Sequence, residues 1–343
     1  MNQITTIAID VGKRTFQVGG ENARGEEQWQ ERFTTREEFV RFLATLQPPL
    51  HVVMEVGLGA QAWARELQSR GLRVSLLPAA AVAKHRSGPK NDRNDVRAIL
   101  RAARDVSIHP VPIKSAEQLA MQALHRARAG WIRRRTALAN QMRGLLTEHA
   151  MVFAQGERAL RRGLESVLAD PSVPIPARLL DLLQLLRAEW EHLAEQLNTM
   201  DAELIRLARA DPVARRVDTI RGIGPIGASA LACKGLDPTR YANGRQFSAS
   251  FGIVPDQHSS SDRYRLGRMS RRGDRYVRSL LICGAHAVIR ALPRRTQDDS
   301  QETRRLRRWV ARCGAKGAAI RLANHNLREV YALLTHNEDH HMI

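Results

Sequence analysis

The chain has 343 residues, more than the roughly 100 to 200 of a typical domain, and its 43% hydrophobic content is enough for two or three packed cores. Lys and Arg number 54 against 35 Asp and Glu, which gives a net charge of +19 and makes nucleic acid the expected partner. The sequence has no uninterrupted apolar run of about 18 residues and no signal-peptide pattern, so no membrane partner and a cytoplasmic location are expected.

The N-terminal part, residues 1–110, predicts an α/β domain. Its strand-like segments are short and apolar, and its first helix opens with a Thr35-x-x-Glu38 capping box. The expected order β-β-β-α-β-α-β is that of the ribonuclease-H-like fold. We expect strands at residues 4–10, 15–19, 28–33, 51–56 and 74–77, and helices at residues 35–46 and 60–69.

Four acidic residues in this domain are candidates for a metal site. Asp10 ends the first strand and Glu55 ends the fourth, and a carboxylate in an apolar strand is unfavourable unless it is paired or bound to a metal. Asp92 and Asp95 are three residues apart at a helix start, so they share one helical face. Such oxygen ligands suit Mg²⁺, with Mn²⁺ as the alternative ion. For the helical pair, an ordinary capped surface helix is the alternative, because the helix dipole favours Asp in a first turn.

The N-terminal residues also allow a different interpretation. The stretch IAIDVGKRTF resembles the first phosphate loop of actin-like ATPases and sugar kinases, which use Asp-x-Gly on a related fold. Those proteins need a second, adenosine-binding lobe with glycine-rich turns, and nothing after Leu100 has that pattern.

Residues 111–210 predict a helical region. One helix extends from a capping box at Ser115 to about residue 149, and Arg133 and Arg134 on its basic face are candidates for binding a nucleic-acid backbone. A solvated basic face is the alternative.

From Leu179 to Leu207 the spacing between apolar residues alternates between four and three positions, which is the heptad pattern of a coiled coil. This coiled coil can pair within the chain or with a second chain, and we favour a contact between chains.

Residues 211–335 predict a third, mostly helical region, followed by a polar tail at 336–343. Its segment 219–233 has the Gly-x-Gly turn of a helix-hairpin-helix, in which Gly222 and Gly224 would expose backbone N–H groups to a phosphate; an ordinary turn between helices is the alternative.

A serine cluster that includes Ser260 then lies next to a run of arginines. It is either a polar loop or the source of a nucleophile for a phosphodiester. The candidate phosphate-binding cations are Arg263, Arg265, Arg268, Arg271 and Arg272 near the serines, and Lys90 and Arg93 near Asp92.

Five motifs in a fixed order carry a resemblance to a known family over about residues 4–330. They are AIDVGK, MEVGLGAQ, KNDRNDVRA, GIGPIGA, and QFSASFGIVPDQHSS followed by RMSRRGDRYVRSLL. Together they resemble the DEDD insertion-sequence transposases that are guided by a bridge RNA.

The resemblance implies specific roles for these residues. An N-terminal domain similar to the Holliday-junction resolvase RuvC would supply four acids, which fall on Asp10, Glu55, Asp92 and Asp95. A C-terminal transposase domain would supply a nucleophilic serine, which maps to Ser260. The family works as a homo-oligomer, a dimer or tetramer, in which acids from one subunit meet the serine of another. Its partners are donor DNA, target DNA and a guide RNA, and serine attack leaves a covalent phosphoserine–DNA intermediate.

Two other functions also fit the residues. A metal-dependent junction resolvase or nuclease would use the four acids to activate water and would leave no protein attached to DNA. A non-catalytic nucleic-acid-binding scaffold would need only the positive charge, and it would tolerate replacement of all four acids. Ser259 and Ser261 are alternatives to Ser260 as the nucleophile.

Overall fold

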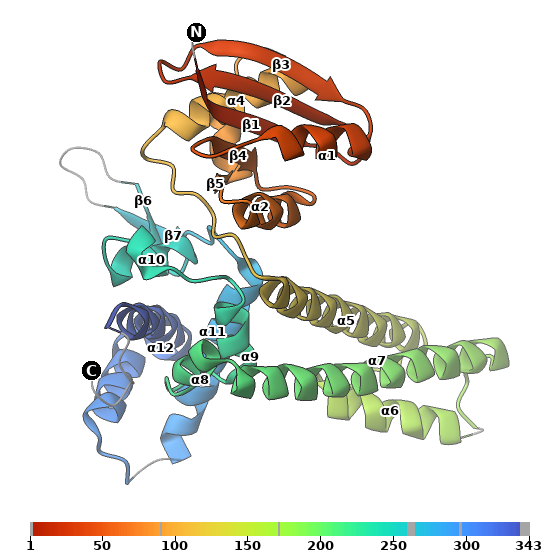
Figure 1. The fold of residues 1–343 in the computed structure, drawn as a ribbon. Helices are drawn as coiled ribbons and strands as arrows, with labels where there is room; N and C mark the ends of the chain where they lie inside the picture. The colour runs from red at the N-terminus through yellow and green to blue at the C-terminus, as the bar shows by residue number, and fades with distance from the viewer. Residues whose placement is uncertain (1–2, 90, 171, 259–264, 295–296, 337–343) are drawn as a thin grey trace. The chain divides into compact units, whose positions relative to one another are not determined.

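The computed structural model describes residues 3–89, 91–170, 172–258, 265–294 and 297–336, and the chain divides into two compact units (Figure 1). Unit 1 comprises Met1–Leu119 and Lys234–Arg240, and unit 2 comprises Ala120–Cys233 and Tyr241–Ile343. The prediction of an N-terminal α/β part followed by a mostly helical part is confirmed. The predicted regions 111–210 and 211–335 both fall mainly in unit 2.

Unit 1 is built on a five-stranded sheet with the order β3-β2-β1-β4-β5. β2 pairs antiparallel with both β1 and β3, and β4 and β5 run parallel to β1. This arrangement has the predicted order of elements and is ribonuclease-H-like. The strands are β1 (Ile4–Val11), β2 (Phe16–Asn22), β3 (Glu27–Phe33), β4 (His51–Glu55) and β5 (Arg73–Leu77), and the helices are α1 (Arg36–Thr45), α2 (Ala60–Ser69), α3 (Ala79–Val82) and α4 (Asp92–Arg104).

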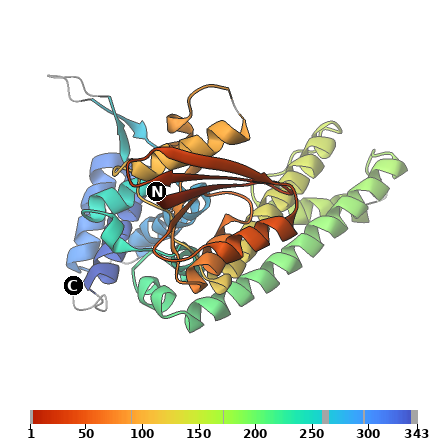
Figure 2. The ribbon, with the colours of Figure 1, turned by 45° about the horizontal axis from the view of Figure 1, so that its top comes forward.

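Helices cover both faces of this sheet because alternate strand residues are apolar on each side (Figure 2). On one face the strands pack against α1 and α2, and the rings of Phe16 and Phe39 stack with centroids 4.0 Å apart. On the other face α4 packs on β1 and β4 through Val96 and Ile99. Gly19 of β2 lets this helix approach closely, since a Cβ there would lie 2.7 Å from Cγ1 of Val96.

In unit 2, α5 (Ala116–Thr147), α6 (Glu157–Ala169) and α7 (Ala177–Ala210) share one core. The helix predicted to carry the heptads is α7, and Leu183, Trp190 and Leu193 of its apolar seam pack with Leu138 of α5 and Leu164 of α6. The N-terminal half of the seam is therefore covered by helices of the same chain. A coiled coil between two chains stays a prediction. The helix α6 was not predicted from the sequence.

The remainder of unit 2 consists of shorter helices, a β-hairpin and two long helices. The last helix bends at Gly314, whose φ of 69° is not helical. The elements are α8 (Pro212–Asp218), α9 (Pro225–Ala232), α10 (Gly244–Ser250), β6 (Pro255–Gln257), β7 (Leu266–Met269), α11 (Arg275–Ala291) and α12 (Gln301–His336). Within the described part of the chain, no helix has both the length and the apolar character that a membrane span requires.

Candidate active site

Asp10 and Glu55 stand at the ends of neighbouring parallel strands. Ile9 of β1 pairs with Met54 of β4, and each acid is the next residue along its strand. Neighbouring strands are about 4.8 Å apart, so the sheet brings both residues to the same end. Because side chains alternate along a strand, both carboxylates belong to the face on which Val53 packs against α4.

The helix α4 carries Asp92 and Asp95 in its first turn and runs antiparallel to β1. Its start lies at the end of β3, where Nη2 of Arg32 is 3.8 Å from Oδ2 of Asp92. Its last turn lies before the start of β3, where Arg104 donates a hydrogen bond to the Gly25 carbonyl. Because β3 runs in the same direction as β1, the start of α4 faces the strand ends that carry the other two acids.

Polar contacts hold the first turns of α4 in place. Asn91 is the N-cap and accepts a hydrogen bond from the Asn94 amide at 2.8 Å, while the Asn94 side chain donates to the Pro89 carbonyl at 2.8 Å. One turn later Arg97 donates to both carboxylate oxygens of Glu27 on β3, at 2.7 and 3.2 Å. This hydrogen bond is the main reason that the pKa of Glu27 lies below its ordinary value. The helix start is thus held by the segment that precedes it and by a contact with β3.

Asp95 is already engaged by a cation. Nε of Arg86 lies 2.5 Å from Oδ1 of Asp95, and the two side chains are only 26% and 15% exposed. Among the residues that the structure describes, no three Asp, Glu, His or Cys side chains are close enough to hold a metal ion. The donor chemistry suits a divalent ion, but the Arg86 charge on Oδ1 of Asp95 competes with a metal for this carboxylate. The pairing of Arg86 with Asp95 was not predicted from the sequence. The metal site stays a prediction.

A polar cavity of about 550 Å³ opens beside Asp92. Gln17, which is paired with Asp10 across β1 and β2, lines it together with Arg93 and other polar residues of β3 and α4. Arg93 is exposed, as expected for a phosphate-binding cation. Lys90, the other predicted cation here, lies outside the described residues. The cavity has the amide and guanidinium donors that phosphate oxygens require.

The predicted nucleophile Ser260 and its neighbour Arg263 lie outside the described residues, in the segment between β6 and β7. Arg265 precedes β7 and Arg268 lies within it, and both are exposed. Arg271 and Arg272 follow β7 and are also exposed, and Arg272 lies 3.9 Å from Asp256. The described part of the hairpin therefore presents guanidinium groups to solvent, where a phosphate backbone can reach them.

Two residues that the sequence analysis missed hold the base of this hairpin. Arg278 of α11 is 7% exposed and donates from Nη1 to the carbonyl oxygens of Phe251 and Arg272, both at 3.0 Å. Asn324 of α12 donates to the carbonyl of Ile253 at 2.8 Å. The chain entering and leaving the hairpin is thus tied to both long C-terminal helices.

The Gly-x-Gly turn joins α8 to α9. Gly222 has a φ of 97°, which favours glycine, and its carbonyl would lie 2.0 Å from a Cβ at Gly284 of α11. The side chain of Asn326 in α12 donates to the Arg221 carbonyl at 3.0 Å. Gly222 therefore packs against two helices, whereas Gly224 is exposed with open space around its Cβ position. Phosphate binding by this turn stays a prediction.

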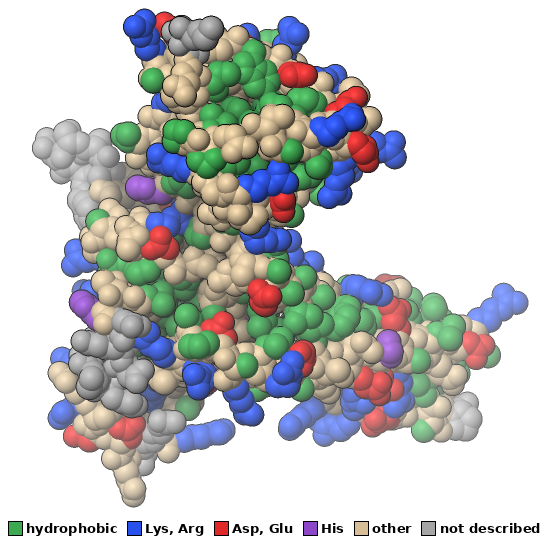
Figure 3. Space-filling model, in the orientation of Figure 1, with side chains coloured by type: hydrophobic (Ala, Val, Ile, Leu, Met, Phe, Trp, Pro, Cys, Tyr) green, Lys and Arg blue, Asp and Glu red, His purple; other side chains and the backbone are tan. Residues whose placement is uncertain are grey.

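Arg133 and Arg134 are exposed on α5. Arg134 forms an ion pair with Glu189 of α7, with its nitrogen 3.3 Å from the carboxylate oxygen. Lys and Arg side chains are spread over the visible faces of both units rather than gathered in one patch (Figure 3). Nucleic-acid contacts are therefore expected from several surfaces.

Comparisons with known proteins cover nearly the whole chain. A family model of DEDD transposases of the IS110 type, described as "Transposase", matches residues 7–151, and one described as "Transposase IS116/IS110/IS902 family" matches residues 214–301. The chain is 39% identical to a probable family 20 transposase of Pseudomonas aeruginosa over 97% of both chains. It is 33% identical to the transposase for insertion sequence element IS1111A of Coxiella burnetii, covering 98% of this chain and 92% of the relative. The chain belongs to the IS110/IS116 family of DEDD transposases.

Proposed function

We propose that the chain cuts and rejoins DNA through a covalent phosphoserine intermediate on Ser260, with Mg²⁺ held by Asp10, Glu55, Asp92 and Asp95. The topology of unit 1 supports the metal half of this proposal most directly. The parallel strands β1 and β4 and the antiparallel α4 direct four carboxylates toward one end of one sheet face. Carboxylates are the ligands that Mg²⁺ prefers, and Mn²⁺ can take its place.

In the proposed reaction the energy of the broken phosphodiester bond is kept in the phosphoserine ester, so that strands can be rejoined. The Ser260 hydroxyl oxygen attacks the scissile phosphorus, and the bond from phosphorus to the leaving deoxyribose oxygen breaks. The serine proton is released, and the leaving oxygen takes up a proton to become a free hydroxyl. A hydroxyl of a second strand can then displace the serine. A divalent ion, when bound, supplies Lewis-acid stabilisation of the phosphate charge, and Arg265 and Arg268 can offset the same charge.

A guide RNA and a homo-oligomer complete the proposal. The net charge of +19 and the spread of exposed arginines provide more cationic surface than one DNA duplex would need. Leu182 and Leu185 on α7 are 40% and 70% exposed, which leaves apolar area for a second chain. Salt-dependent co-purification of a defined RNA from cells would test the RNA partner directly.

The deciding experiment traps the protein on a nicked DNA substrate in Mg²⁺ and maps the modified peptide by mass spectrometry. We expect an adduct on Ser260 in the wild-type protein and none in Ser260→Ala, with the free energy of unfolding changed by no more than about 0.5 kcal/mol. Ser259→Ala and Ser261→Ala are matched controls and should keep the adduct. If Ser260→Ala still cuts DNA without an adduct, the nuclease alternative is correct.

Replacement of Glu55 by Gln tests the acidic half. It keeps the side-chain shape but removes the charge, so adduct formation should be lost while nucleic-acid binding persists. Unchanged adduct formation in Mg²⁺ would show that Glu55 has a structural role and is not a metal ligand. If acids and serine come from different subunits, mixing inactive Glu55→Gln and Ser260→Ala proteins should restore adduct formation. An inactive mixture that still assembles would contradict the composite site.

A further inference from the structure

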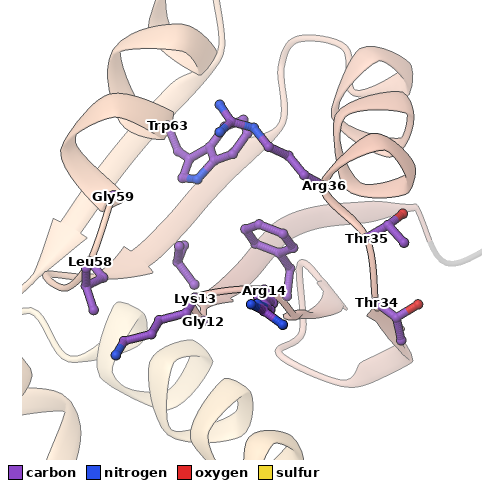
Figure 4. A pocket seen from close by; sticks show the side chains of 11 residues that line it. Gly12, Lys13, Arg14, Thr34, Thr35, Arg36, Leu58, Gly59 and Trp63 are labelled. Atoms are coloured by element: carbon purple, nitrogen blue, oxygen red, sulfur yellow. The ribbon is translucent and has the colours of Figure 1, made fainter.

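A second cavity in unit 1, here called the Trp63 pocket, has no role in the proposed reaction. It has a volume of about 460 Å³, within the range of roughly 300–1,000 Å³ found for small-ligand sites. Its walls come from the β1–β2 turn, the connection from β3 to α1, the loop after β4 and the side chain of Trp63 in α2 (Figure 4). It belongs to the sheet face covered by α1 and α2, opposite to α4.

Three cations line the Trp63 pocket without an acidic counterpart. Lys13, Arg14 and Arg36 are exposed, and none of them forms an ion pair with a carboxylate within the described ranges. Figure 4 shows the Arg36 guanidinium over the Trp63 ring, Arg14 in the β1–β2 turn, and Lys13 directed toward the side of Leu58. Uncompensated cations around a cavity favour an anionic ligand.

Trp63 provides a rigid aromatic wall. Its ring makes edge contacts with Phe16 and Phe39, whose centroids are 5.9 and 5.2 Å away. The guanidinium carbon of Arg36 lies 5.2 Å from the centroid of the Trp63 ring. Leu58, which is 66% exposed, adds an apolar edge. The Arg36 guanidinium already lies over this ring, and a nucleobase could occupy the same side of it by stacking.

The β1–β2 turn argues for a strand rather than for ATP. The amide of Gly12 donates to the Thr15 carbonyl at 3.0 Å, so this N–H serves the turn itself and is not a cradle for phosphate. The cationic side chains of Lys13 and Arg14 remain as the phosphate ligands. Binding of a strand phosphate by Lys13 and Arg14 would give the turn after Asp10 a role that does not need the second lobe of the ATPases.

We propose that the Trp63 pocket receives an unpaired nucleotide of the bound nucleic-acid strand. The base takes the place of the Arg36 guanidinium on Trp63, and Arg14, Lys13 and the displaced Arg36 hold the phosphates. Arg36 is exposed and its contact with the ring is a weak one, so it can move. The inference rests on the proposed function, because the pocket loops directly follow Asp10 and Glu55. The acids and the pocket lie on opposite faces of the sheet but at the same strand ends, so a strand with its scissile phosphate at these acids would reach the pocket by crossing those ends.

The test uses the full-length protein and fluorescence anisotropy with a single-stranded DNA, an RNA of the same sequence, and the fully paired duplexes. Arg14→Gln and Arg36→Gln should each reduce the dependence of log affinity on log salt by about 0.7 for single strands. Trp63→Ala should weaken single-strand binding by about tenfold or more. Arg41→Gln is the matched control, because it removes the same charge from an exposed position of α1 outside the pocket. It should weaken single-strand binding much less than the pocket variants do.

A second measurement locates the base. Irradiation of a bound strand that carries 5-iodouracil should cross-link Trp63, and the DNA and RNA versions identify which strand enters the pocket. If wild-type protein binds single strands but the pocket variants match Arg41→Gln and no adduct forms at Trp63, the pocket proposal is wrong while the proposed function stands. Cross-linking by a halogenated nucleoside triphosphate but by neither strand would also overturn it. Absence of any nucleic-acid binding by the wild type would refute both proposals.

Discussion

Replacing Arg278 by Met should loosen the hairpin that carries the proposed nucleophile. The Arg278 side chain is 7% exposed, and its Nη1 donates to two backbone carbonyls, those of Phe251 and Arg272. A hydrogen bond to a charged group contributes about 1.5–3 kcal/mol, and loss of the donor would leave both carbonyls without this partner. Removal of a buried cation offsets part of the loss, so we expect unit 2 to be destabilised by about 2–3 kcal/mol.

Urea unfolding followed by circular dichroism measures this change. Arg275→Met is the matched control, because Arg275 is exposed one turn earlier on α11 and its replacement should change stability by no more than about 0.5 kcal/mol. Phosphoserine formation should fall in Arg278→Met under conditions where the protein is still folded. Equal unfolding midpoints and equal adduct yields for the two variants would show that Arg278 does not hold the hairpin in place.

Three further predictions concern other contacts. Arg86→Gln should raise the affinity for Mn²⁺ by about tenfold in calorimetry, because Asp95 no longer has a competing cation; an unchanged affinity would show that the pair does not oppose metal binding. Burial, and then the charge of Arg73, lowers the pKa of His51, so its stabilising contribution is complete above about pH 6.5 and is lost as the pH falls. His51→Gln should therefore flatten the decline of thermal stability below that pH, and an unaltered decline would exclude His51. Gly284→Ala should destabilise by roughly 1–3 kcal/mol in urea unfolding, because its Cβ would meet a carbonyl at 2.0 Å, whereas Gly130→Ala, with open space, should not.

Local patterns in the sequence were sufficient to predict the five strands and the helices α1, α2 and α4 of unit 1, but not the short α3. The capping box of Thr35 and Glu38 is present at the start of α1. The short apolar segments form the strands of the expected sheet, and the Asp pair opens α4 after the Asn91 cap. Each of these features depends on neighbouring residues, and such short-range effects can be read from a sequence. The positions of the four acids follow from the same elements.

The roles of individual arginines could not be predicted in this way. Arg86 and Arg278 are chemically the same as the exposed arginines around them, and only the folded chain shows which carboxylate or carbonyl each one meets. A weak signal existed for Arg278, since it lies three and seven residues before Leu281 and Ala285 on the buried stripe of α11. A cation in such a stripe indicates a buried partner, but not its identity.

The two groups proposed to act on one phosphate depend on separate units of the chain. The acids rely on the sheet and α4 of unit 1, whereas the hairpin formed by β6 and β7 relies on α11 and α12 of unit 2. A change at Arg278 should therefore lower adduct formation without altering metal affinity, whereas Arg86→Gln should raise metal affinity without loosening the hairpin. Independent effects of the two changes are compatible with acids and serine from different subunits, because neither group then depends on the fold around the other. Restored adduct formation in a mixture of Glu55→Gln and Ser260→Ala proteins would show that the two groups come from different chains.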